Sequence, residues 1–123
     1  MSITIRFLLI AAIYGLISVI LGMVMGAQEN FSLMPVHAHL NLLGWFALTL
    51  YGIVYKIYPV MGQSKLASIQ FYVANLGVLL LIPALALFLL GTKAVLPVMI
   101  AGELLTVASL TIFLINIWIH RDQ

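Results

Sequence analysis

Residues 34–58 read MPVHAHLNLLGWFALTLYGIVYKIY, and this stretch decides the class of fold. An α-helix needs about 20 mostly apolar residues to cross a bilayer. The stretch meets that length, and Pro59 ends it because proline cannot continue a helix. Pro35 suits a first helical turn, and Ser32 is predicted to cap it. The sequence therefore predicts a membrane-spanning helix that carries two histidines near its start.

The composition of the whole chain points to lipid as its solvent. Of 123 residues, 65% are hydrophobic and 7% are charged, whereas a soluble domain has about 45–50% apolar and about 25% charged residues. A chain this short cannot bury so many apolar side chains in its own core. A soluble monomer and a disordered chain are therefore excluded. The net charge of +2 is too small and too scattered to indicate nucleic-acid binding.

Three further stretches have the length and composition of membrane spans. Together with the first they cover, approximately, residues 3–25, 34–58, 66–90 and 95–119. The connections are short and rich in turn residues, which predicts an all-α, up-down four-helix bundle. Residues 1–123 are thus expected to form a single transmembrane domain. The first span is predicted to be a retained helix, because its apolar run is longer than that of a cleaved signal peptide.

Lysine and arginine predict the orientation of the bundle in the membrane. With the N-terminus inside, Arg6, Lys56, Lys65 and Arg121 lie on the cytoplasmic side and only Lys93 lies outside. Positive residues accumulate on the cytoplasmic side of membrane proteins. Both termini are therefore expected in the cytoplasm, with the two histidines of the second span at the outer face.

The spacing of His37 and His39 limits what they can bind. The chain has no cysteine, so histidines are its only strong nitrogen or sulfur ligands for a metal. Two residues apart on an α-helix, the two imidazoles point about 200° apart. This divergence argues against a compact copper or zinc site, but lets each ring serve a different neighbour. Spacing alone leaves two readings open, either haem iron ligands or an interfacial histidine beside a helix–helix hydrogen bonder.

Glu103 is the one carboxylate predicted inside a span. Such groups are costly in a bilayer and are usually retained for a function. It is interpreted either as a proton-handling or histidine-orienting group, or as a protonated acid that hydrogen-bonds across helices. Asn75 and Asn116 are predicted to make hydrogen bonds between helices.

A set of eight residues in the second span carries a resemblance to a known family. These residues are His37, His39, Leu43, Gly44, Trp45, Gly52, Tyr55 and Pro59. In this register they resemble the tenth transmembrane helix of haem–copper oxidase subunit I. The nearest likeness is to the C-family (cbb-type) oxidases and their nitric oxide reductase relatives. The resemblance covers about 23 of the 123 residues, and the other spans match only as generic apolar helices.

The resemblance implies a haem b site in the cytoplasmic membrane of a prokaryote. By it, His37 matches a ligand of the high-spin haem iron and His39 a ligand of the low-spin haem iron. Trp45 is interpreted either as a residue that flanks a haem or as a packing residue. Copper is less expected, because the chain has no counterpart of the histidines that hold the second metal in the family. The implied activity is electron transfer, with a redox partner, or binding of a diatomic gas, O2 or NO.

The chain has the length of one four-helix unit, whereas the family subunit has about twelve spans. The sequence therefore predicts a homo-oligomer, a trimer or a dimer, with haem held between protomers by His37 and His39. Two alternatives stay open at this point. One is a non-catalytic accessory or assembly subunit of a respiratory complex, and the other is an oxygen or nitric oxide reductase assembled from identical units. Whether the chain is an enzyme is left undecided.

Overall fold

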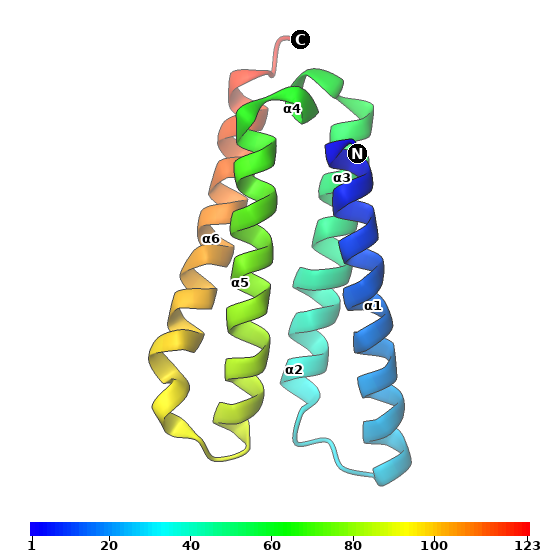
Figure 1. The fold of residues 1–123 in the computed structure, drawn as a ribbon, viewed down its shortest axis with the longest axis vertical. Helices are drawn as coiled ribbons and strands as arrows, with labels where there is room; N and C mark the ends of the chain where they lie inside the picture. The colour runs from blue at the N-terminus through cyan, green and yellow to red at the C-terminus, as the bar shows by residue number, and fades with distance from the viewer.

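The computed structural model describes all residues from Met1 to Gln123 as an up-down bundle of four long helices. The second of them is divided into three consecutive segments. The helical segments of the four spans are α1 (Ile3–Gln28), α2 (Met34–His39), η1 (Leu40–Phe46), α3 (Ala47–Ile57), α5 (Lys65–Leu89) and α6 (Leu96–Ile119). Both chain termini lie at the same end of the bundle (Figure 1). The prediction of four spans in an up-down bundle is confirmed.

The helix ends differ slightly from the predicted ones. Helix α1 continues through Gly26 and ends at Glu29, whose left-handed φ of 50° turns the chain. Ser32 does not cap α2, since its N–H and hydroxyl both donate to Asn30 Oδ1. Two further short helices occupy connections that were predicted as turns. They are α4 (Pro59–Gln63) and the 3-10 helix η2 (Lys93–Val95).

The second span contains a π-helical stretch, η1, which sequence reasoning missed. A π turn is wider than an α turn and is usually found as a short insertion within an α-helix. Leu43 within η1, and Ala47 and Tyr51 in α3, line one groove towards α6. His37 and Trp45, eight residues apart, both contact α1.

Close glycine contacts hold the helices together in two hairpins, α1 with the second span and α5 with α6. A β-carbon placed on Gly102 of α6 would lie 2.6 Å from the backbone nitrogen of Leu81 in α5. One placed on Gly44 would lie 2.9 Å from Tyr14 Cβ in α1. Small residues let helix backbones approach closely in membranes, where water does not drive helices together.

Buried polar side chains join the two hairpins near the end that holds the termini. Tyr55 donates its hydroxyl to Gln70 Oε1 at 2.5 Å, and the Asn116 amide donates to Tyr55 and to the Met61 carbonyl. Further along the bundle, the Tyr14 hydroxyl donates to the Asn75 side chain. The predicted interhelical hydrogen bonds of Asn75 and Asn116 are thus confirmed.

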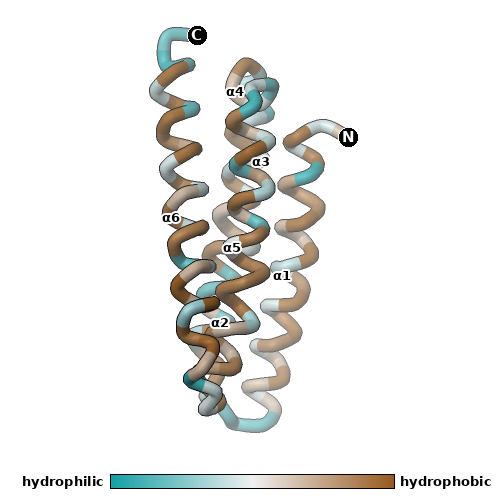
Figure 2. The backbone as a smooth tube through the Cα atoms, turned by 60° about the vertical axis from the view of Figure 1, so that its left-hand side comes forward, coloured by the Kyte–Doolittle hydropathy of each residue, from teal (hydrophilic) through white to brown (hydrophobic).

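The four spans are strongly apolar along the chain (Figure 2). Four helices are long and apolar enough to cross a bilayer. Of the most apolar stretch of α6, 11% is buried within the chain, against 28% for each of the other three spans. Large apolar side chains exposed on all four spans suit lipid and not water. The chain is therefore a multi-pass membrane protein.

Candidate functional site

The candidate site lies at the end of the bundle that holds the α1–α2 and α5–α6 connections, named here the His37 end. His37 is half-buried on α2 and faces α1. Its Nδ1 lies 2.8 Å from the Ser18 carbonyl oxygen, and the ring lies against Gly22. A carbonyl only accepts hydrogen bonds, so Nδ1 carries the proton and a neutral ring keeps a lone pair on Nε2.

His39 is exposed on the same short helix and has a similar internal bond. Its Nδ1 donates to the Pro35 carbonyl at 2.7 Å, one turn back, and Nε2 has no hydrogen-bond partner within the chain. His120, at the opposite end of the bundle, makes the same contact with the Asn116 carbonyl. The hydrogen bond to the carbonyl one turn back is therefore formed within a single helix, whereas the bond of His37 to α1 depends on the tertiary structure.

The two histidines of α2 serve different sides of the second span. His37 contacts α1, while His39 is exposed and comes four residues before Leu43, which lines the groove towards α6. No group of three His, Cys, Asp or Glu side chains gathers anywhere in the chain. A compact metal site made by one chain is therefore absent, and each imidazole offers a single nitrogen to an outside group.

Trp45 packs on α1 and not on a histidine. A β-carbon on Gly15 would lie 2.9 Å from the indole ring, so the two helices are closely fitted at this point. The side chain stays 42% exposed. One face of the indole is thus held by α1, and its outer part is available to a neighbour in the membrane.

Glu103 is exposed on α6 and makes no hydrogen bond or ion pair within the chain; the chain's one ion pair joins Arg121 and Asp122. Backbone carbonyls of Ser18 and Pro35, and not this carboxyl, orient the two imidazoles. Within one protomer, Glu103 makes no hydrogen bond to either histidine or to another helix.

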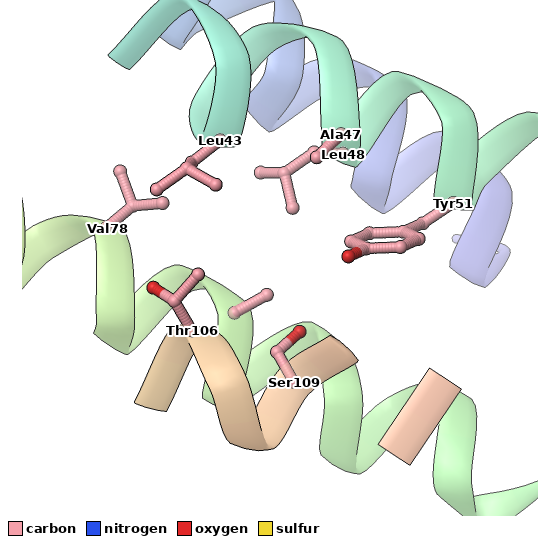
Figure 3. A pocket seen from close by; sticks show the side chains of 8 residues that line it. Leu43, Ala47, Leu48, Tyr51, Val78, Thr106 and Ser109 are labelled. Atoms are coloured by element: carbon pink, nitrogen blue, oxygen red, sulfur yellow. The ribbon is translucent and has the colours of Figure 1, made fainter. Parts of the chain in front are cut away.

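The interior of the bundle has no room for a large cofactor. A cavity of about 20 Å³ lies between the second span and the α5–α6 hairpin, and the buried and unpartnered hydroxyl of Ser109 lines it. Figure 3 shows the side chains around it. That volume fits about one water molecule. A much larger groove of about 410 Å³ lies on the surface between the second span and α6, lined by apolar side chains such as Leu43, Phe46 and Leu110. A planar cofactor of haem size would have to bind at the surface.

Comparison with protein families, with curated proteins and with solved structures finds no match for the chain. The site therefore rests on its own geometry. Sequence reasoning selected His37, His39, Trp45 and Glu103, but missed Ser18 as the partner of His37. The sequence feature that indicates this contact is Gly22, a small residue one turn from Ser18 on the same face of α1, which leaves room for the His37 ring.

Replacing Gly22 with alanine is expected to displace the His37 ring. The new β-carbon would lie 2.9 Å from Cε1 of the imidazole, so the ring must move away from α1 and its bond to Ser18 weakens. The ¹⁵N resonances of His37 should shift, while those of His39 and His120 stay unchanged. Gly26→Ala is the matched control on the same helix, because nothing lies within 4 Å of its β-carbon. Equal shifts in both variants would contradict the contact.

Proposed function

We propose that the chain is a haem b-binding protein of the cytoplasmic membrane of a prokaryote, in which His37 and His39 hold haem iron between protomers. One observation carries the proposal. Each ring donates Nδ1–H to a backbone carbonyl, which leaves Nε2 as the ligand nitrogen. Metal-bound histidines usually have their second nitrogen fixed in this way.

The fit of haem to these residues is supported by three further features. His39 is exposed beside an apolar groove of about 410 Å³, which suits the edge of a porphyrin. Trp45 has a partly exposed ring on the same helix. The interior cavity is too small for haem, so the cofactor belongs at the surface, where a second protomer can cover it.

The divergence of the two rings favours a homo-oligomer, a dimer or a trimer. A low-spin haem needs two axial ligands, and one chain directs only one imidazole to each side. A second copy supplies the other ligand by symmetry. Bound haem b supplies a one-electron Fe(III)/Fe(II) couple, which suits electron transfer with a redox partner, or O2 or NO binding where one axial position is open.

The charge distribution supports an orientation with both termini in the cytoplasm, because the end opposite His37 carries Arg6, Lys56, Lys65 and Arg121. The haem-binding histidines then lie near the outer face. The resemblance of residues 37–59 to haem–copper oxidase subunit I agrees with that placement.

The test is a reduced-minus-oxidised absorption spectrum of the purified protein, reconstituted with haem where needed. We expect a Soret band and the α band of haem b, in proportion to protein. Carbon monoxide then separates an open iron site from one closed by two histidines. A sample that binds no haem after supplementation would contradict the proposal and would favour an accessory subunit.

A further inference from the structure

Glu103 and Asn41 are exposed polar side chains within the spans that have no partner inside the chain. Glu103 on α6 and Asn41 on η1 are both exposed, and neither makes a hydrogen bond or ion pair with another residue. Exposed polar groups at this depth are costly in hydrocarbon and are normally paired. Both groups therefore need a partner from outside the protomer.

The two groups lie at matching depth. Asn41 comes seven residues after Met34, the first residue of α2, and Glu103 seven residues after Leu96, the first residue of α6. Both helices start at the His37 end and carry proline in the first turn. At about 1.5 Å of rise per residue, each group sits about 10 Å inside its helix start.

The two groups lie on exposed faces of different hairpins, and they make no hydrogen bond with each other within one chain. Asn41 belongs to the hairpin of α1 with the second span, and Glu103 to the hairpin of α5 with α6. A contact between two copies can bring these faces together, whereas folding of one copy does not.

The chemistry of an amide and a carboxylic acid suits this pairing. A protonated Glu103 donates its O–H to the Asn41 carbonyl and accepts one N–H of the same amide, which makes two hydrogen bonds without net charge. A neutral pair avoids the cost of burying a carboxylate in lipid. His39 offers only one free nitrogen, which the haem proposal assigns to iron.

We propose that α6 of one copy docks on the second span of another copy, with Glu103 paired to Asn41. Helix α6, the least buried of the four spans, is then covered by the next protomer. The contact is reciprocated in a dimer, or repeats around a ring if the oligomer is a trimer. This interface stands on exposure, depth and hydrogen-bonding capacity, and does not require haem.

The absence of cysteine from the chain gives a direct test. N41C and E103C are made in separately tagged copies, co-expressed, and treated in membranes with a mild oxidant. We expect a disulfide that joins the two tags. The matched controls are Leu42→Cys and Leu104→Cys, exposed neighbours that point elsewhere on the same helices, and they should cross-link at least fivefold less.

Equal cross-linking in the control pairs, or none with N41C and E103C, would overturn the proposal. His39→Cys is tested against E103C in the same way. If E103C cross-links mainly to this variant, the proposal is overturned and Glu103 pairs with His39 of the other copy. A second measurement uses native side chains. E103Q keeps two hydrogen bonds to Asn41 and should retain the oligomer in detergent, whereas Glu103→Leu should shift it towards monomer. If the copies cross-link as expected but the protein shows no haem spectrum, the haem proposal is refuted and the interface proposal stands.

Discussion

Replacement of His39 by alanine is expected to remove one spectral component of bound haem. Its Nε2 is the freely exposed nitrogen of the His37 end, and its Nδ1 contact is local to α2. The change therefore removes the proposed iron ligand without disturbing the helix packing. His37→Ala should remove a different component, because His37 faces α1 on the other side of the helix. Haem per protein and the reduced-minus-oxidised spectrum measure both effects.

His120→Ala is the matched control for these variants. It has the same Nδ1 bond to the carbonyl one turn back, but lies at the opposite end of the bundle. We expect its haem content and spectrum to equal those of the unmodified chain. If His37→Ala and His39→Ala lost the same component, one haem would be shared and the assignment of separate faces would be wrong. Unchanged spectra in both would remove these histidines from the haem site.

Gly102→Ala is expected to be the most destabilising single-methyl change in the chain. The added β-carbon would lie 2.6 Å from the backbone nitrogen and 2.8 Å from the Cα of Leu81. The backbone atoms of Leu81 cannot rotate away as the end of a side chain can, so α5 and α6 must separate. Overpacking of this kind costs about 1–3 kcal/mol, partly offset by alanine's helix preference of about 1 kcal/mol. A net loss of about 1 kcal/mol is expected in the free energy of unfolding, measured by denaturant titration in micelles.

Gly26→Ala again serves as the control, because its β-carbon meets nothing within 4 Å. There the helix preference of alanine acts alone, so the variant should be as stable as the parent or slightly more stable. The signs of the two changes are therefore opposite. A stabilising effect of Gly102→Ala would show that the α5–α6 hairpin is more loosely packed than this geometry indicates.

Much of the architecture was predictable from the sequence because the membrane imposes a simple rule. A span needs about 20 apolar residues with its backbone hydrogen bonds satisfied internally. The predicted span 34–58 ends one residue beyond the observed helix, and the predicted span 66–90 is shifted by one residue at both ends relative to α5. The extension of α1 through Gly26 was missed, because glycine is tolerated in a helix whose stop is set by Glu29.

The sequence by itself determined that four apolar spans lie in lipid, and that His37 and His39 diverge on one helix. Only the tertiary structure decided what each polar group meets. His37 on α2 lies against Ser18 of α1, whereas Glu103 on α6 makes no hydrogen bond within the chain. Periodicity fixes directions around one helix, whereas contacts between helices depend on where their glycines let backbones approach.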